Sequence, residues 1–380
     1  MAAAALIVLA GVGFVGTVYS FILTDKSAAE RDFISYWSAG QLLHHGQNPY
    51  DFEAVHKLEL EAGRDPKELL LTMRNPPTAF FLAFPLGFAG PKTCLIAWMG
   101  VLLGALSLAI LLIWKTNSSP DSRWHLLGYM FAPAYACLMA GQFGIVMLLG
   151  VALFLYLHRT RPFQAGMAFA LCALKPHYFL PFGLVLVLWS ASTKSGRILA
   201  GFFTAVAAMC AFAWVLDSHA WAQYSHMMQA GGALNEVIPV LSAQLRLLVH
   251  PQAAWIQFVP EAGACLWAAW YFWNHRLSWN WNDHGLLVLL VGALSTPFGW
   301  FFDESVLLPA VVAGICRAIE GRRPVWPVIV ICGVALLEIV GGVEVISRFY
   351  LWTTPAWLAW YLYATRGKRS TLTPVAQPSS

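Results

Sequence analysis

From residue 91 onward the chain consists of apolar segments separated by short polar breaks, and few folds accept this pattern. Runs of roughly 17–25 apolar residues match the length that an α-helix needs to cross a bilayer. Across all 380 residues, 59% are hydrophobic and only 11% are charged. That is too little charge to cover a soluble globule of this size. We therefore expect an all-α polytopic membrane protein.

The apolar runs predict about twelve transmembrane helices. They lie near residues 2–23, 91–114, 123–139, 143–157, 162–174, 177–191, 197–216, 253–273, 284–296, 303–319, 325–341 and 351–364. Several are short, which suits a bundle whose irregular backbone lines protein or water. The first segment lacks the basic start of a cleavable signal peptide, so we expect it to be retained, with cleavage near residues 27–29 as the alternative.

The charges of the alternating turns predict the orientation. One set of turns carries thirteen Lys and Arg against three acidic residues, so the positive-inside rule makes its side cytoplasmic. Its cations are Lys115, Arg123, Arg159, Arg161, Lys194, Arg197, Arg276, Arg317, Arg322, Arg323, Arg366, Lys368 and Arg369. We expect one integral-membrane domain over 1–369 with cytoplasmic termini, an external loop over 24–90 that carries short helices, and a disordered cytoplasmic tail over 370–380.

Asp32 is the candidate for a catalytic carboxylate. It lies about nine residues past the first predicted span, ahead of bulky residues with helical spacing over 33–43. A carboxylate that is partly desolvated near a bilayer has a raised pKa, as a general base requires. The structural alternative is an N-cap for the following helix, because Asp is a preferred capping residue.

Two arrangements in the same loop could suggest a metal. His44 and His45 are adjacent, so they do not share a helix face, and no second ligand cluster lies nearby. Asp51 and Glu53 could hold a divalent ion beside phosphates. The favoured interpretation is that Asp51 starts a polar helix over 51–61, with Glu53 in its first turn. We expect no metal site.

Three cations on the external side are candidate ligands for a lipid-linked phosphate. Lys175 is flanked by apolar residues, is costly near lipid and should face the bundle interior, with snorkelling to the interface as the alternative. Arg74 precedes a double proline at headgroup level. Arg246 lies in the amphipathic or re-entrant segment 217–252, where a surface anchor is an equal alternative.

Five further residues on this side are candidates for binding the sugar or the acceptor. Trp300 could stack on a sugar ring, and Asp303 could hold its hydroxyls. The alternatives are an interfacial position for Trp300 and an N-cap for Asp303. Gln142, His177 and Gln244 lie in the neighbouring polar breaks.

Taken in order, these residues resemble glycosyltransferase family 87, polyprenol-phosphate-sugar-dependent transferases that include bacterial α-mannosyltransferases. The matching pieces are Asp32 with Gly46-Gln47-Asn48-Pro49-Tyr50, Asn75-Pro76-Pro77 before Phe84-Pro85-Leu86, Gly141-Gln142, Ala173-Leu174-Lys175-Pro176, Gln244-Leu245-Arg246, and Ser295-Thr296-Pro297 leading to Trp300. The resemblance covers most of the chain. It departs at Phe301-Phe302-Asp303, where many members have histidines after the tryptophan.

The resemblance implies a GT-C type fold with an external active site and a polyprenyl-phosphate sugar as donor. It also implies that Asp32 is the general base, since an aspartate of the first external loop is the proposed base in that family. A monophosphate leaving group needs less charge neutralisation than a nucleoside diphosphate, so cationic side chains could suffice without a metal or another cofactor. A retained first helix and a polyprenyl donor suit a bacterial inner membrane, with the active site on the periplasmic or extracellular side.

The expected function is transfer of a hexose such as mannose, or of a pentose, to a hydroxyl of an envelope glycan or glycolipid. Inversion is expected because no second carboxylate is evidently placed as a nucleophile. The chain lacks a Gly-rich phosphate loop and a D-x-D motif, which argues against a cytosolic nucleotide-sugar enzyme. The net charge of +4 gives no argument for a nucleic-acid partner. The alternatives are a transporter or flippase for a lipid-linked sugar and a non-catalytic assembly subunit.

Overall fold

The computed structural model describes residues 28–230, 238–344 and 347–366, and these residues form helices and connecting turns without a strand. The prediction of an all-α protein is therefore confirmed. The predicted first helix over 2–23 and the tail over 370–380 lie outside the described residues. The number of spans and the single domain over 1–369 stay predictions.

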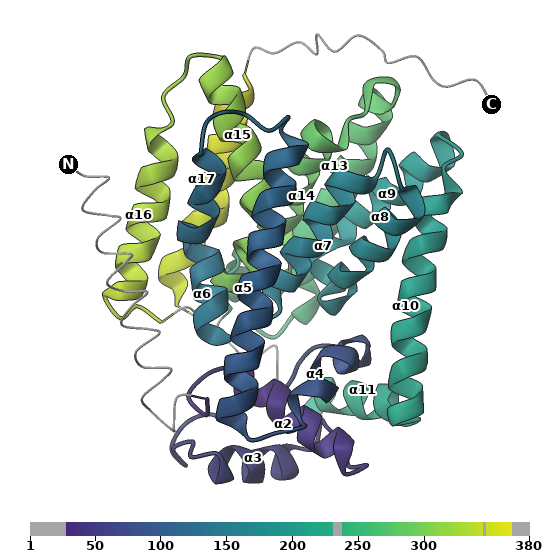
Figure 1. The fold of residues 1–380 in the computed structure, drawn as a ribbon, viewed down its shortest axis with the longest axis vertical. Coiled ribbons are helices and arrows are strands. Elements are labelled where there is room, and N and C mark those ends of the chain that lie inside the picture. The colour runs from purple at the N-terminus through teal and green to yellow at the C-terminus, as the bar shows by residue number, and fades with distance from the viewer. Residues whose placement is uncertain (1–27, 231–237, 345–346, 367–380) are drawn as a thin grey trace.

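The helices form a tall bundle with a smaller layer across one end (Figure 1). We refer to the smaller layer as the end layer; it contains α2 (Phe33–His44), α3 (Phe52–Glu61), α4 (Phe80–Leu86) and α11 (Ala220–Ala230). The two longest helices, α5 (Pro91–Thr116) and α10 (Gly196–Leu216), connect the end layer with the far end of the bundle. The remaining α-helices are α6 (Ala132–Ala140), α7 (Gly144–Leu157), α8 (Pro162–Phe169), α9 (Leu180–Ser192), α12 (Leu241–Val249), α13 (Val259–His275), α14 (Leu286–Ser295), α15 (Leu308–Glu320), α16 (Trp326–Val340) and α17 (Thr353–Thr365).

Individual residues in the sequence explain how the helices of the end layer start and pack. Helix α3 starts at Asp51 as predicted, because the Asp51 carboxylate accepts hydrogen bonds from the backbone N–H groups of Glu53 at 2.9 Å and Ala54 at 3.0 Å. Helix α2 packs on α4 so closely that a Cβ on Gly40 would lie 2.3 Å from the carbonyl oxygen of Ala83. The end layer is therefore a packed unit that fixes the position of α2.

Several predicted spans begin or end in 3₁₀ turns near the end layer. These turns are η4 (Ala170–Leu174), η5 (Pro176–Phe179), η7 (Ala254–Phe258), η10 (Phe301–Leu307) and η11 (Arg348–Trp352). Lys175 lies between η4 and η5, and Pro176, which has no backbone N–H, begins η5. Irregular backbone at this depth must line protein or water. The bundle therefore offers polar groups on the side that faces the end layer.

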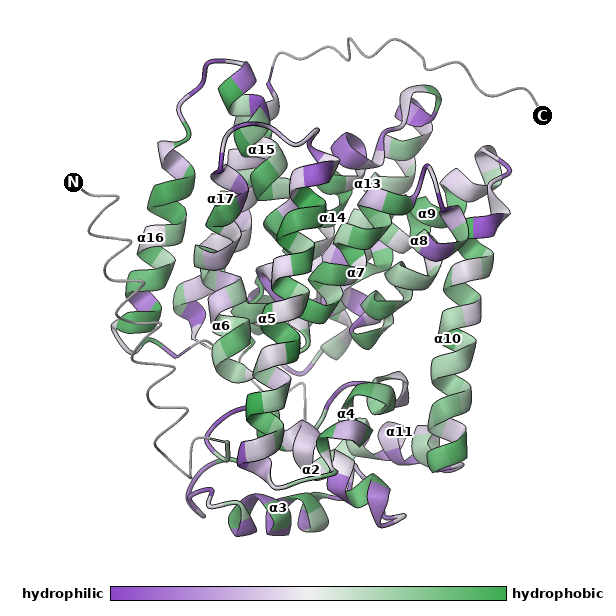
Figure 2. Cartoon of the chain, in the orientation of Figure 1, coloured by the Kyte–Doolittle hydropathy of each residue, from purple (hydrophilic) through white to green (hydrophobic). Residues whose placement is uncertain are grey.

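The outside of the bundle is apolar. Helices α5 and α10 are long and apolar enough to cross a membrane, judged by length and composition alone. Large hydrophobic side chains on them are exposed, among them Val101 at 54% and Phe203 at 60%. Figure 2 shows hydrophobic residues along the length of the bundle and more hydrophilic residues toward its two ends. Soluble monomers rarely expose apolar surface on this scale, so the chain is suited to a membrane.

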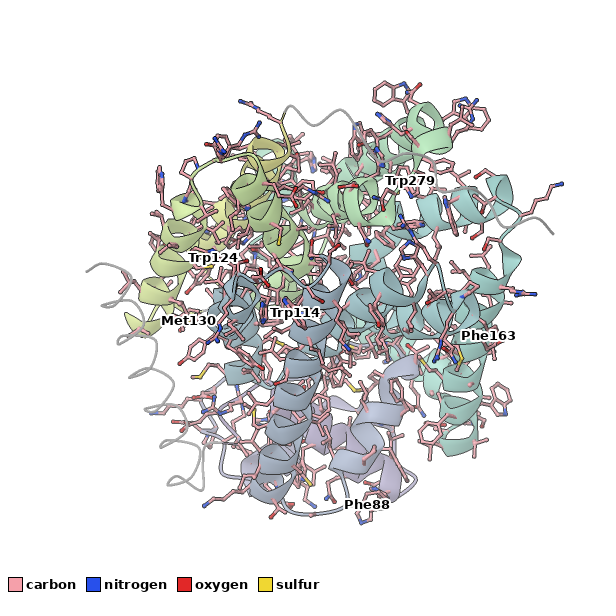
Figure 3. The ribbon with its side chains drawn as sticks, turned by 45° about the horizontal axis from the view of Figure 1, so that its top comes forward. Phe88, Trp114, Trp124, Met130, Phe163 and Trp279 are labelled. Atoms are coloured by element: carbon pink, nitrogen blue, oxygen red, sulfur yellow. The ribbon has the colours of Figure 1, made fainter. Side chains whose placement is uncertain are left out.

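Aromatic side chains lie toward both ends of the molecule. Phe88, in the loop after α4, is 70% exposed beside the end layer, and Trp279 lies at the opposite end (Figure 3). Exposed Trp270 and Trp273 on α13 belong to that opposite end as well. Trp and other aromatic residues are typical of the two membrane interfaces. Their placement is consistent with a bundle that lies across a bilayer.

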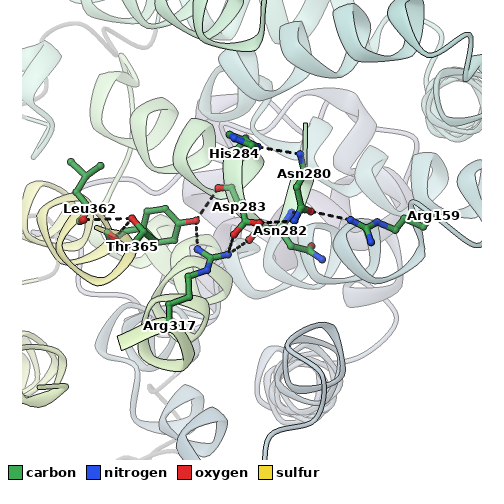
Figure 4. A network of polar contacts seen from close by, with 9 residues as sticks. Arg159, Asn280, Asn282, Asp283, His284, Arg317, Leu362 and Thr365 are labelled. Carbon is green, nitrogen blue, oxygen red and sulfur yellow. Dashed lines mark hydrogen bonds and ion pairs between the residues drawn. The ribbon is translucent and has the colours of Figure 1, made fainter. Parts of the chain in front are cut away.

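The far end of the bundle is held by a polar network (Figure 4). Arg317 of α15 donates a hydrogen bond to the hydroxyl of Tyr361 in α17 at 2.6 Å and forms an ion pair with Asp283. Asn280 donates to the Asp283 carboxylate at 2.5 Å and accepts from Arg159 at 3.2 Å. The network joins turns that carry much of the positive charge. That this end is cytoplasmic stays a prediction.

Two glycines allow α8 to cross α10 at close range. A Cβ on Gly166 would lie 1.9 Å from the carbonyl oxygen of Ile198, and one on Gly201 would lie 1.9 Å from that of Phe163. We expect Gly166→Ala to lower the free energy of unfolding by about 1–3 kcal/mol, because the two backbones must separate. A drop in the melting temperature of the detergent-solubilised protein would measure this.

The matched control is Gly104→Ala in α5, where a Cβ would meet no atom within 4 Å. Alanine favours a helix more than glycine does, so this variant should be as stable as the parent or slightly more so. Equal melting temperatures for Gly166→Ala and Gly104→Ala would contradict a close crossing.

Candidate active site

Asp32 lies directly before α2 and is oriented by the turn between α6 and α7. It occupies the N-cap position, yet its side chain makes no capping hydrogen bond. Its Oδ2 instead accepts a hydrogen bond from Nε2 of Gln142 at 2.8 Å. The hydroxyl of Tyr36, one helical turn after Asp32, donates to Oε1 of the same Gln142. The glutamine amide therefore fixes the carboxylate and is itself fixed by α2.

The turn that carries Gln142 is pressed against α2 because it contains a glycine. Gly141 adopts a φ of +71°, and a Cβ there would lie 2.8 Å from Cβ of Phe33. Its carbonyl oxygen accepts a hydrogen bond from Nε1 of Trp98 at 2.8 Å. The rings of Tyr36 and Phe143 stack with centroids 3.9 Å apart. Glycine at position 141 thus permits the contact between Gln142 and Asp32.

The surroundings of Asp32 favour its protonated form on balance. Burial raises the pKa of the Asp32 carboxyl above its ordinary value, and the negative charge of Asp303 adds to the rise. The hydrogen bond from Gln142 and the positive charges of Lys175 and Arg64 lower the pKa but do not cancel the effect of burial. Residues from four distant parts of the chain therefore act on one carboxylate.

Arg64 also holds the backbone on which Asp32 lies. The buried Arg64 guanidinium donates to the carbonyl oxygens of Ala29 at 2.7 Å and Leu69 at 2.7 Å. It lies 3.6 Å from the buried carboxylate of Glu59. The chain segment that leads into Asp32 is consequently tied to the end layer three residues before the carboxylate.

Lys175 and Asp303 form a buried ion pair in the neighbouring part of the bundle. Nζ of Lys175 lies 2.6 Å from Oδ1 and 2.8 Å from Oδ2 of Asp303, whose side chain is fully buried. The ammonium group also lies 5.5 Å from the ring centroid of Trp300 and 5.2 Å from that of Phe302. Lys175 therefore points into the protein and does not reach for the surface.

Asp303 is not the N-cap residue that the sequence suggested as an alternative, because Trp300 occupies that position. Asp303 is the third residue of η10, and its Oδ2 accepts a hydrogen bond from the backbone N–H of Trp300 at 3.0 Å, which is a capping contact made from inside the turn. Both carboxylate oxygens therefore already accept hydrogen bonds. Its position suits anchoring Lys175 and the Trp300 turn better than holding sugar hydroxyls.

The double-proline loop is docked onto the segment that carries Lys175. Nδ2 of Asn75 donates to the carbonyl oxygen of Leu174 at 2.9 Å, and the hydroxyl of Tyr50 donates to the carbonyl oxygen of Asn75 at 2.9 Å. The carbonyl oxygen of half-buried Arg74 accepts from Tyr224 of α11 at 3.4 Å. Two motifs that lie about 100 residues apart in the sequence thus meet beside the ion pair.

The other predicted residues lie in the surrounding helices. The ring of His177 packs edge-on against Phe298, with centroids 5.8 Å apart. Gln244 donates to the carbonyl oxygen of Ile238 at 3.3 Å, and buried Arg246 donates to that of Pro251 at 3.1 Å. The contacts of Gln244 and Arg246 hold the backbone around α12. The contacts at the centre of the site are instead those between Asp32 and Gln142 and those of Lys175 with Asp303 and Trp300.

Sequence reasoning missed two polar residues of this region. Tyr36 is a helical neighbour of Asp32 at spacing i, i+4, which could have indicated it. Glu304 follows Asp303 and is 7% exposed, and its Oε1 lies 2.6 Å from the hydroxyls of both Thr353 and Thr354. No local pattern links Glu304 to the start of α17, so only the tertiary structure reveals that contact.

The residues that the sequence raised as possible metal ligands have other contacts in the structure. Within residues 28–230, 238–344 and 347–366, no three His, Cys, Asp or Glu residues are grouped so that they could hold a metal ion. The rings of His44 and His45 hydrogen-bond to the carbonyl oxygens of Phe84 at 3.0 Å and Gln41 at 2.7 Å. Asp51 is the N-cap of α3. The contacts of His44, His45 and Asp51 therefore hold the backbone of the end layer.

An all-helical bundle with an apolar exterior, and with a buried carboxylate and ion pair below a polar layer at one end, defines a class of membrane-associated protein with an internal polar site. The sequence model of glycosyltransferase family 87 matches residues 74–297, more than half of the chain. The chain therefore belongs to glycosyltransferase family 87 and is a glycosyltransferase. No curated protein and no solved structure matches it. The matched segment contains Gln142 and Lys175, whereas Asp32 and Trp300 lie outside it.

Proposed function

We propose that this glycosyltransferase takes a sugar, a hexose such as mannose or a pentose, from a polyprenyl-phosphate donor and transfers it to a hydroxyl of an envelope glycan or glycolipid. The observation that carries the proposal is the oriented carboxylate of Asp32 beside the buried pair of Lys175 and Asp303. A base and a cation close together are what transfer from a phosphate leaving group requires. The reaction would take place on the external face of a bacterial inner membrane, within a GT-C type fold.

Asp32 acts as the general base in this mechanism. Its carboxylate removes the proton from the acceptor hydroxyl, whose oxygen attacks the anomeric carbon. The bond between that carbon and the lipid phosphate breaks, and the phosphate leaves with the electron pair. Gln142 holds the carboxylate through one oxygen, so the other oxygen can receive the proton. This is a single displacement in which the hydroxyl enters opposite the leaving phosphate, so the anomeric configuration is inverted.

Lys175 is the cation best placed to meet the leaving phosphate. An ammonium group has three donors, and two of its contacts go to the Asp303 oxygens. The third can hydrogen-bond to a phosphate oxygen while Asp303 keeps the amine oriented. Arg74 and Arg246 remain further candidates at the edges of the site. Lipids surround the bundle, and neither a metal nor a nucleic acid has a part in this proposal.

The pH dependence of transfer tests the role of Asp32. Only the ionised carboxylate can accept the proton, so kcat/KM should rise with pH through a pKa above the ordinary value of an aspartate. Gln142→Leu removes a hydrogen bond that lowers this pKa and should shift the profile to higher pH. Transfer from synthetic polyprenyl-phosphate sugars would be measured across pH.

The matched control is Gln41→Leu. The Gln41 side chain lies on the same helix α2 but donates to the carbonyl oxygen of Gly87 in the end layer, at 2.7 Å. Its replacement should leave the pH profile where it is. A profile that does not move in Gln142→Leu, or that moves to lower pH, would count against Asp32 as the base.

The flippase alternative is examined with the same protein in lipid vesicles. It requires that a lipid-linked sugar crosses the bilayer without forming a product. Product formation and the leaflet in which a labelled donor lies would both be measured. Transfer forms a product and requires Asp32 as the proton acceptor, whereas a flippase moves the donor to the other leaflet without forming one. Translocation that persists in Asp32→Asn, with no product from the parent protein, would favour the flippase.

A further inference from the structure

A narrow pocket lies beyond Trp300, beside the ion pair. Trp300 directly before η10 and Glu304 within it line the pocket, together with Tyr178 after Lys175 and Thr354 at the start of α17. Side chains of the segment before α12, of α14 and of η11 contribute to its other walls. Trp300 is shared with the site described above, since its ring lies near the ammonium group of Lys175. The pocket therefore adjoins the proposed catalytic region, and Trp300 forms a wall between the two.

Within the part of the chain that the structure describes, one carboxyl oxygen of Glu304 has no role in holding the fold together. Its Oε1 lies 2.6 Å from two threonine hydroxyls, those of Thr353 and Thr354. Its Oε2 is buried and has no hydrogen-bond partner among the described residues. Buried polar atoms nearly always have partners, and an unsatisfied carboxylate oxygen is costly. An external hydrogen-bond donor would satisfy it.

The chemistry of the pocket selects the kind of donor. The described residues that line the pocket include no cation, so a phosphate belongs with Lys175 and not here. A carboxylate and a threonine hydroxyl suit alcohol groups, and the rings of Trp300 and Tyr178 offer flat apolar faces. A sugar ring combines hydroxyl groups with an apolar face. Because the pocket is narrow, it suits the hydroxyl-bearing edge of one ring.

We infer that Glu304 and Thr354 form a sugar-binding subsite that holds non-reacting hydroxyls of a substrate ring, with Trp300 separating it from the phosphate at Lys175. This inference rests on the proposed function and adds the residues that recognise the sugar. The ring could belong to the donor or to the acceptor, since both present the same alcohol groups. The experiment below distinguishes these two sources.

The test compares binding of polyprenyl-phosphate sugars with binding of the bare polyprenyl phosphate by the full chain in nanodiscs. The parent protein should bind the glycosylated lipid at least tenfold more tightly. Glu304→Leu and Thr354→Val should each reduce that ratio by about tenfold, because each removes a hydrogen-bonding group from a buried site. Thr354→Val changes little volume and guards against misfolding of Glu304→Leu.

Glu261→Leu is the control for loss of a buried carboxylate. Glu261 is 4% exposed in α13, also has an oxygen without a partner among the described residues, and does not line the pocket. Its replacement should leave the binding ratio unchanged. If instead only the KM for the acceptor rises in both pocket variants, the subsite holds the acceptor's ring. If binding ratio and acceptor KM both stay at the parent values, the inference is wrong.

Failure of the proposed function has a different signature. The protein could bind the sugar, lose that binding in the pocket variants and yet form no product. That result would support the subsite and refute the transfer reaction. A parent protein that does not distinguish glycosylated from bare lipid, and whose pocket variants keep the acceptor KM, would overturn the subsite even if Asp32 proves essential for transfer.

Discussion

Asp32→Asn is expected to lower the rate of sugar transfer by about 10²–10⁴-fold, the usual contribution of a general base. The amide has nearly the same shape and can still accept the hydrogen bond from Gln142, so the fold should be retained. It cannot take a proton from the acceptor hydroxyl. The measurement is single-turnover transfer from a synthetic polyprenyl-phosphate sugar, with donor binding and melting temperature recorded for the same preparation.

Asp51→Asn provides the matched control for this substitution. Asp51 lies in the same end layer and caps α3, a role in which asparagine performs as well as aspartate. The variant therefore removes one negative charge from the end layer without changing the cap. Its transfer rate should equal that of the parent. A parent-like rate in Asp32→Asn at normal stability would refute the mechanism.

Lys175→Met is expected to have the largest effect on stability. It leaves the fully buried carboxylate of Asp303 without its cation, and loss of one partner from a buried ion pair costs about 3–5 kcal/mol. We also expect donor affinity to fall, because the phosphate loses its nearest ammonium group. Thermal unfolding and donor binding would be measured in parallel.

A double variant separates these two consequences. Lys175→Met combined with Asp303→Asn removes the uncompensated charge, while the asparagine carbonyl can still accept the hydrogen bond from the backbone of Trp300. The double variant should regain most of the free energy of unfolding that Lys175→Met loses, since replacing both partners of a buried pair is often nearly neutral. Donor affinity should stay low. Recovery of donor binding together with stability would mean that Lys175 has a structural role only.

The helices themselves could largely be predicted from the sequence. The apolar runs over 91–114 and 197–216 correspond to α5 (Pro91–Thr116) and α10 (Gly196–Leu216), because apolar length and the flanking Gly and Pro residues are local properties. The polar helix after Asp51 was predicted from a different local signal, the acidic residue at its start and Glu53 in its first turn. The 3₁₀ turns could not be predicted, since the choice between 3₁₀ and α-helix in runs such as 162–174 depends on packing against other helices.

The candidate site was predictable as a set of residue types but not as a set of contacts. Position and residue type drew attention to Asp32 and Lys175 because polar groups are costly near lipid. The sequence did not indicate that Asp303 is engaged with Lys175, which leaves it poorly suited to hold a sugar. It also gave no reason to choose Glu304, whose threonine partners come from another helix.

The sequence by itself therefore determined the helical class, the apolar exterior and the concentration of unusual polar residues in the breaks between helices. These follow from periodicity, composition and the cost of polar groups in hydrocarbon, which are properties of short segments. Only the tertiary structure decided that Gln142 orients Asp32 across 110 residues and that Asp303 pairs with Lys175 across 128. Such pairs depend on how distant helices pack. Their hydrogen bonds and ion pairs form only once folding has brought those helices together, so no short segment of the sequence encodes them.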